Sequence, residues 1–251
     1  MSDFDRNIAA RGGFADRAAA IDAGLRAYML RVYNYMAAAV ALTGVTAWAT
    51  FNAAVVADAS GRLSLTPFGQ AIYGGPVQIV LLLGTLGLVF FISFRIQRLQ
   101  YSTALALFML YAGLLGVVLS SIFLAYTGAS VTRVFFISAA AFGALSLYGY
   151  TTQRDLSAMG SFMIMGLFGI IIASLVNLFL KSSGLDWAIS IIGVGVFAGL
   201  TAWDTQKIKE VYDSRDDANT VGRKVVMGAL SLYLDFINLF LMLLRLMGDR
   251  R

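Results

Sequence analysis

The sequence contains no cysteine, no histidine, only two prolines and only 13% charged residues. Without cysteine, disulfides and thiolate metal sites are excluded. Without histidine, any response to pH near neutrality must come from carboxylates, because the side chain that usually titrates there is missing. Pro67 and Pro76 both lie in one connecting segment, so none of the long apolar stretches contains a proline kink.

Apolar residues make up 59% of the 251-residue chain. The mean hydropathy is +0.77. This composition excludes an ordinary soluble domain and is typical of an integral helical membrane protein. In a membrane protein, lysine and arginine mainly set the orientation of the spans. The net charge of +5 therefore does not indicate a nucleic-acid partner. We expect the membrane lipid itself to be the surrounding partner.

Seven stretches are long and apolar enough to cross a bilayer as helices, which takes about 20 residues each. The sequence therefore predicts an all-α membrane protein with seven transmembrane helices. Residues 1–31 are polar, of mixed charge and without the apolar core of a signal peptide. We expect a cytoplasmic tail at 1–31 and a single transmembrane domain at 32–251. The predicted spans are 32–51, 77–94, 103–125, 134–150, 162–180, 187–203 and 225–247.

The distribution of lysine and arginine predicts the orientation of these spans. If the N-terminus is cytoplasmic, the cytoplasmic segments hold 13 of the 19 basic residues, and the opposite side holds 6. Positive charge is enriched in cytoplasmic loops. The sequence therefore predicts a cytoplasmic N-terminus and, with seven spans, a C-terminus on the other side.

The last span carries a polar stripe on an otherwise apolar helix. Its members follow one another at steps of four and three, which places them on one helical face: Ser231, Asp235, Asn238, Met242 and Arg245. Lipid does not tolerate such a stripe, so it must face protein or a water-filled cavity. We therefore expect the last helix to be enclosed by the other six, with Asp235 as a candidate functional residue. The alternative is a structural Asp235 held by hydrogen bonds to Ser231 or Asn238.

A second carboxylate, Asp204, is expected to lie at a depth in the membrane similar to that of Asp235. Asp235 lies about 15 Å inside the last span, and Asp204 lies about 12 Å before the end of the sixth helix if that helix continues to Tyr212. Asp204 would otherwise be the first residue of a loop. Two carboxylates that meet in a low-dielectric bundle cannot both ionise cheaply, so they share a proton and titrate as a unit. Such a pair can sense pH without histidine.

Two arginines are candidates for gating. Arg95, at the end of the second span, is the nearest cation in depth and can pair with Asp204 or Asp235 in one state and release it in another. Its alternative role, shared with Arg98, is interfacial anchoring. Arg245, at the far end of the polar stripe, is either an interfacial anchor or a gate at the outer mouth.

The sequence shows no catalytic constellation. It has no metal-ligand cluster, no Walker loop and no nucleophile elbow, and no histidine can activate its serines and tyrosines. Intramembrane aspartyl proteases carry Tyr-Asp and Gly-x-Gly-Asp signatures, whereas here Asp204 follows Trp203 and Asp235 follows Leu234. We therefore expect no enzymatic activity and no cofactor.

Three segments carry a resemblance to the Bax inhibitor-1 family, also called transmembrane Bax inhibitor motif proteins. They are residues 204–208 (DTQKI), 230–240 (LSLYLDFINLF) and 149–160 (GYTTQRDLSAMG). Together with the seven spans, the resemblance covers nearly all of the chain after residue 25. The absence of cysteine and histidine makes the chain look like a bacterial member, which implies a multi-pass protein of the inner membrane.

The resemblance implies a pH-sensitive calcium-leak channel in which the last helix is enclosed by six others. The family's proton-sensing aspartates match Asp204 and Asp235, whose hard oxygen ligands also suit calcium. Its cytoplasmic gating arginine best matches Arg95. An outer arginine, matching Arg245, pairs with a glutamate of the second helix, but here the second span holds no acidic residue and Gln78 is only a rough substitute.

The resemblance also implies an alternative function. Some bacterial relatives are associated with a membrane-bound AAA protease through their N-terminal tail. A non-conducting regulator of such a protease, or of cell-death or stress machinery, is therefore the second expectation, and residues 1–31 would carry it.

Overall fold

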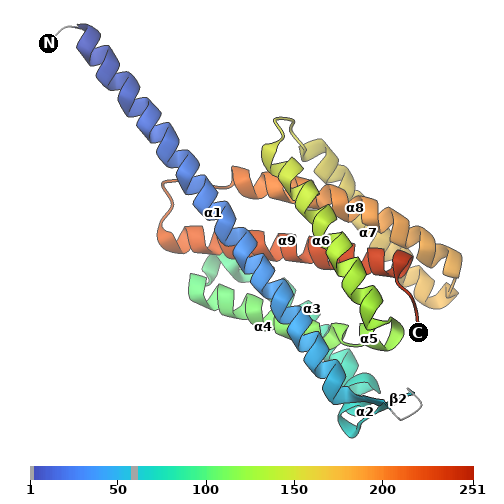
Figure 1. Ribbon diagram of the computed structural model, residues 1–251. Helices are drawn as coiled ribbons and strands as arrows, with labels where there is room; N and C mark the ends of the chain where they lie inside the picture. Colours follow the sequence, from blue (N-terminus) through green and yellow to red (C-terminus); the bar gives the residue numbers. More distant parts are fainter. Residues whose placement is uncertain (1–2, 58–61) are drawn as a thin grey trace.

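The computed structural model describes residues 3–57 and 62–251, with side chains from residue 23 onward except Ala57. Within these residues seven helices are long and apolar enough to cross a membrane. This confirms the predicted all-α, multi-pass membrane protein (Figure 1). The long helices are α1 (Asp3–Ala54), α3 (Pro76–Arg95), α4 (Tyr101–Leu119), α6 (Gly128–Thr151), α7 (Ser157–Leu180), α8 (Ser183–Glu210) and α9 (Ala218–Met247).

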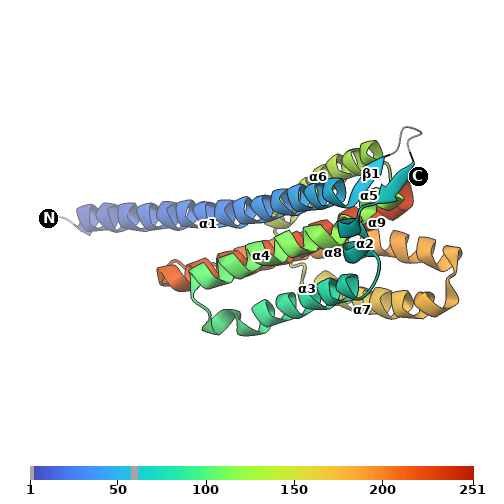
Figure 2. The ribbon, with the colours of Figure 1, turned by 90° about the horizontal axis from the view of Figure 1, so that it is seen from below.

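Helix α9 lies at the centre of the bundle and packs against α8, α1, α6 and α4. In its most apolar window 72% of the residues are buried, compared with at most 44% in any other spanning helix that the structure describes. Helices α3 and α7 lie further out, where α3 packs mainly against α4 and α7 against α8 (Figure 2). The polar stripe of α9 therefore faces the inside of the bundle. This agrees with the expectation from the sequence, because polar side chains that face lipid are costly.

Helix α8 continues without a break from Ser183 to Glu210. The sequence predicted this extension because residues 205–212 contain neither glycine nor proline. Lys207 and Lys209 lie in its last turn, where positive charge favourably complements the helix dipole. Asp204 is therefore a helical residue about two turns before the helix ends, and not the first residue of a loop.

The connection between the first two spans contains structure that the sequence did not predict. Strands β1 (Val55–Ala57) and β2 (Leu63–Leu65) pair antiparallel, and a short helix, α2 (Pro67–Tyr73), follows them. Three-residue strands are too short to show an alternating pattern. The two prolines are explained by helix starts, since Pro67 opens α2 and Pro76 opens α3, and proline suits the first helical position. The other short elements are η1 (Ile96–Arg98) and α5 (Ile122–Ala125).

The first spanning segment begins earlier than the predicted residue 32. Tyr28 and Met29, which precede residue 32, are already buried in the core together with Val32. Helix α1 itself continues back to Asp3 and projects beyond the bundle (Figure 1). The predicted tail 1–31 thus includes one turn and more of the first span. Residues 1–2 and the side chains of residues 3–22 lie outside the described part of the chain.

Asp217 forms the N-cap of α9, and its carboxylate accepts hydrogen bonds from the backbone N–H groups of Asn219 (3.0 Å) and Thr220 (3.3 Å). The hydrogen bond from the Thr220 hydroxyl, above all, lowers the pKa of Asp217. A lowered pKa in the folded state stabilises the fold above the unfolded pKa, and this contribution is lost as the pH falls through the lowered pKa.

We therefore expect wild-type protein to have a higher apparent melting temperature than Asp217→Asn at about pH 6, where the carboxylate is charged. The difference should shrink at about pH 3, because asparagine caps without titrating. Thermal unfolding in detergent at both pH values measures it. A difference that does not change with pH would show that the charge of Asp217 does not stabilise α9.

Candidate functional site

Helices α8 and α9 run side by side, and close contacts fix their register. Added Cβ atoms at Gly193 and Gly228 would meet the side chains of Met242 and Ile208, at 2.8 and 3.1 Å. This register brings Asp204 of α8 and Asp235 of α9 together. The two carboxyl groups are close enough to interact directly. The structure thus places the two predicted acidic residues on neighbouring helices, facing each other.

Both carboxyl groups border a cavity of about 640 Å³ between α7, α8 and α9, which we call the membrane cavity. Its walls are mostly apolar. Four members of the predicted polar stripe line it, namely Ser231, Asp235, Asn238 and Met242. The stripe is therefore a real feature of the fold, and it faces a cavity within the membrane-spanning region. Arg245, its fifth member, is exposed and does not line the cavity.

Asp235 is a buried carboxyl group of α9 with an unsatisfied oxygen atom. It is 5% exposed, and its Oδ2 atom has no hydrogen-bond partner among the described residues. Asn238 donates instead to the Leu234 carbonyl (2.8 Å). The fully buried Tyr233, by contrast, is paired with the Thr43 hydroxyl (2.6 Å). None of the described hydrogen bonds joins Asp235 to Ser231 or Asn238, the partners that the structural alternative names.

A second, smaller cavity of about 230 Å³ lies at the end of the bundle where α8 ends and α9 begins. We call it the vestibule. Asp204 and Ser231 line both the vestibule and the membrane cavity. They therefore stand at the boundary between the two spaces, with Asp235 one helical turn deeper along α9. The remaining vestibule residues are Tyr28, Ile96, Gln97, Lys207, Ile208, Val211, Thr220, Arg223, Lys224, Met227 and Gly228.

Thr205 connects the acidic pair to two other helices. Its hydroxyl donates to the Thr201 carbonyl (2.8 Å) and lies 2.9 Å from the Ser146 hydroxyl, which lies 2.6 Å from the hydroxyl of Tyr33. Each hydroxyl has one proton to donate, so Tyr33 donates to Ser146 and Ser146 to Thr205. This chain of hydrogen bonds joins α1, α6 and α8 beside Asp204.

Gln206 fixes the loop between α6 and α7 against α8. Its Nε2 atom donates to the Arg154 carbonyl (2.8 Å), and its Oε1 atom accepts from the Leu156 N–H (2.8 Å). The adjacent residues Asp204, Thr205 and Gln206 thus have separate roles: one faces the cavities, one joins three helices, and one holds a loop.

We expect Gln206→Ala to accelerate tryptic cleavage after Arg154 several-fold, because the loop loses both hydrogen bonds that hold it and local opening governs proteolysis. Limited trypsin digestion of the purified protein in detergent measures the rate. Gln153→Ala, a change at an exposed residue of the same loop, serves as the control. Equal cleavage rates for wild type and Gln206→Ala would contradict the role of Gln206.

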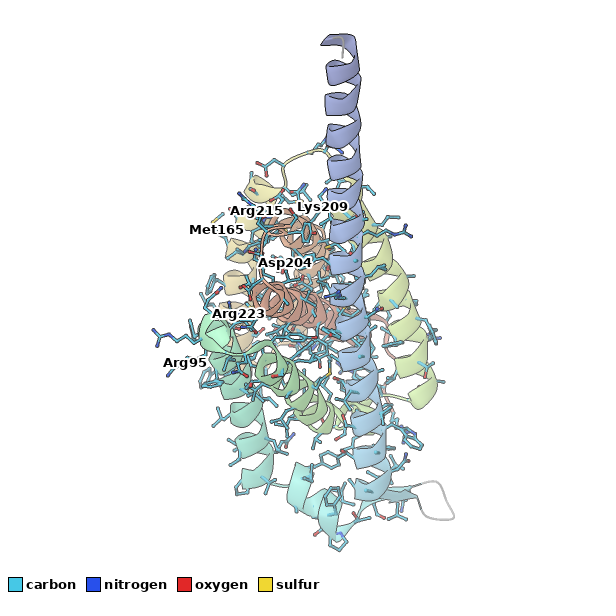
Figure 3. All side chains as sticks on the ribbon, turned by 90° about the vertical axis from the view of Figure 1, so that its left-hand side faces the viewer. Arg95, Met165, Asp204, Lys209, Arg215 and Arg223 are labelled. Atoms are coloured by element: carbon cyan, nitrogen blue, oxygen red, sulfur yellow. The ribbon has the colours of Figure 1, made fainter. Side chains whose placement is uncertain are left out.

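Neither predicted gating arginine contacts the acidic pair in this structure. Arg95 is exposed at the end of α3 and projects outward, away from Asp204 (Figure 3). Arg245 is exposed in the last turn of α9, and none of the described ion pairs involves it. The ion pair that the structure does show near the end of α9 joins Arg133 of α6 to Asp249 (2.7 Å).

The cation that the sequence reasoning missed is Arg223. It lies in the first turns of α9 and lines the vestibule together with Asp204 (Figure 3). A signal was present, since Arg223, Met227, Ser231 and Asp235 follow at steps of four and continue the polar stripe toward the start of α9. The predicted last span begins only at residue 225, whereas α9 begins at Ala218 and includes Arg223.

The described residues contain no group of three or more acidic side chains that could hold a metal ion together. Calcium normally takes six to eight oxygen ligands. The two carboxylates, with the oxygen atoms of Ser231 and Asn238 nearby in the same cavity, do not make a cage for resident calcium. They make a short polar stretch along the wall of the membrane cavity.

Comparison with known proteins agrees with this architecture. A family model described as inhibitor of apoptosis-promoting Bax1 matches residues 25–251. The chain belongs to this family, the Bax inhibitor-1 family. The resemblance recognised from residues 149–160, 204–208 and 230–240 is thereby confirmed.

Similar members of the Bax inhibitor-1 family occur in several bacteria. A protein of Rickettsia prowazekii is 54% identical over 92% of both chains. The inner membrane protein YbhL of Escherichia coli is 48% identical over 91% of this chain and 94% of its own. A protein of Caulobacter vibrioides is 42% identical over the full length of both chains. The chain is thus similar along almost its whole length to bacterial proteins, one of which is named for the inner membrane.

Proposed function

We propose that this protein is a pH-sensitive calcium-leak channel of the bacterial inner membrane, gated by the Asp204–Asp235 pair. The observation that carries the proposal is the position of Asp204 and Ser231, which line the vestibule and the membrane cavity at once. A cation moving between the two spaces must pass these oxygen atoms. In this proposal the vestibule opens to the cytoplasm, because basic residues cluster at that end of the bundle.

The pair accounts for both parts of the proposed activity. Ionised carboxylates attract a divalent cation, and only two of them bind it too weakly to retain it, as a leak requires. Because the carboxyl groups interact directly, a proton on one changes the charge that the cation meets. Cation passage and protonation are therefore coupled at one place. The proposed function needs no enzymatic chemistry and no cofactor; calcium is the transported ion.

Reconstitution tests the proposal. The purified protein in liposomes loaded with a calcium indicator should admit calcium faster than empty liposomes, at a rate that changes between about pH 6 and pH 8. Flux equal to that of empty liposomes at every pH would reject a leak channel. Calcium flux that ignores pH would reject the gating and leave a constitutive leak.

One observation favours the alternative, a non-conducting regulator of a membrane-bound AAA protease or of stress machinery. Helix α1 projects well beyond the rest of the bundle (Figure 1), and a projecting helix can be engaged by a partner. Deleting residues 2–24 should then abolish capture of the protease and leave the bundle folded. Unchanged capture by the truncated protein would exclude this role for the tail.

A further inference from the structure

The vestibule carries more positive charge than a passage for calcium requires. Three basic side chains line it, namely Lys207, Arg223 and Lys224. Lys224 is neutralised, since it forms an ion pair with Asp216 and also donates to the Val211 carbonyl (2.8 Å). Lys207 and Arg223 remain, and Asp204 is the one acidic residue that lines the vestibule with them, while Asp217 lies near Arg223 outside the lining. Such a cavity attracts an anion.

Arg223 is held in place by its terminal nitrogens and still has donors to spare. One nitrogen donates to the Gln97 carbonyl and the other to the Thr220 hydroxyl (3.0 Å). Its Nε atom is buried and has no hydrogen-bond partner among the described residues. None of the ion pairs that the structure describes involves Arg223. A fixed guanidinium with unused N–H groups suits a tetrahedral oxyanion such as phosphate.

Lys207 complements Arg223 from α8. Its ammonium lies 4.7 Å from the centre of the Trp203 ring, a cation–π contact that orients the group. The contact leaves N–H donors available, and Asp204 is near enough to attract Lys207 but forms no ion pair with it in the described structure. Tyr28 and Ser231 line the same cavity, and their hydroxyl groups can act as further donors.

We propose that the vestibule is a binding site for a phosphate-bearing anion, held by Arg223 and Lys207. Its volume of about 230 Å³ accommodates a phosphate group. Phosphate at this end of the bundle has two sources, a free phosphate compound or the headgroup of an anionic phospholipid at the membrane surface. The proposal goes beyond the leak function and does not depend on it, because binding is measured without calcium flux.

The test is binding to the full-length protein in a neutral detergent. Inorganic phosphate is titrated by calorimetry, and retention of phosphatidylglycerol is compared with that of phosphatidylcholine by native mass spectrometry. We expect Lys207→Gln and Arg223→Gln each to weaken binding about tenfold or more, the loss expected for a hydrogen bond to a charged group. Arg98→Gln, which removes an exposed charge outside the vestibule, should bind as wild type.

Saturable phosphate binding that the vestibule variants weaken assigns the site to a free phosphate compound. Selective retention of phosphatidylglycerol, lost in the same variants, assigns it to a lipid headgroup. If Arg223→Gln fails to fold, Lys207→Gln decides alone, because Lys207 is exposed and its side chain makes none of the described hydrogen bonds. The proposal is overturned if neither probe binds saturably or if Lys207→Gln binds as tightly as wild type. It is also overturned if Arg98→Gln loses as much binding affinity as the vestibule variants.

Discussion

Asp235→Asn is expected to flatten the pH dependence of calcium flux through the reconstituted protein. Asparagine has the shape of aspartate but no titrating proton, so the pair can no longer exchange one. Asp204→Asn should have the same effect. Because the two carboxyl groups interact directly, the double variant should be no flatter than either single variant, as is normal for residues that act as a unit.

The measurement is the ratio of initial calcium flux at about pH 6 and at about pH 8. For both single variants this ratio should approach one. Asp213→Asn is the matched control, since it removes a carboxylate from the loop before α9 that lines neither cavity. A single variant that keeps the wild-type ratio would show that the remaining carboxylate senses pH alone, and the idea of a shared proton would fail.

Gly149→Ala is expected to destabilise the protein by about 1–3 kcal/mol, the usual cost of overpacking. A Cβ atom at Gly149 of α6 would lie 2.1 Å from the Ala202 carbonyl oxygen of α8. Backbone cannot rotate away as a side chain can, so the two helices must separate. Their separation would also strain the hydrogen bond between Ser146 and Thr205 (2.9 Å), and Thr205 directly follows Asp204 in α8.

Unfolding in mixed detergent micelles measures the change in the free energy of unfolding. Gly143→Ala is the control on the same helix, because a Cβ atom there meets nothing within 4 Å. Alanine has the higher helix propensity, so Gly143→Ala should be neutral or slightly stabilising. Equal stability of the two variants would mean that α6 and α8 are not closely packed at Gly149.

Much of the fold was predictable because it depends on local properties of the sequence. Apolar runs of membrane length gave the seven spans, and the steps of four and three between Ser231 and Met242 gave the polar face of α9. The acidic pair followed from the depth of Asp204 and Asp235 along two uninterrupted helices. Each of these properties can be calculated within a single helix.

The parts that could not be predicted depend on how helices distant in sequence are placed. The hydrogen-bonded chain of Tyr33, Ser146 and Thr205 joins three helices, and no spacing in the sequence relates them. The direction of Arg95 depends on the rotation of α3, which packs mainly against α4. Arg223 belongs to the site because α8 and α9 together form the vestibule, and neither helix alone indicates it.

The central claim is that calcium passage depends on a proton shared by Asp204 and Asp235. Calcium flux against pH for the wild-type protein, beside the Asp204→Asn/Asp235→Asn double variant and empty liposomes, tests it most directly. We expect wild-type flux above that of empty liposomes with a clear change across neutral pH, and a pH-independent rate in the double variant. A double variant that follows the wild-type pH profile would contradict the claim.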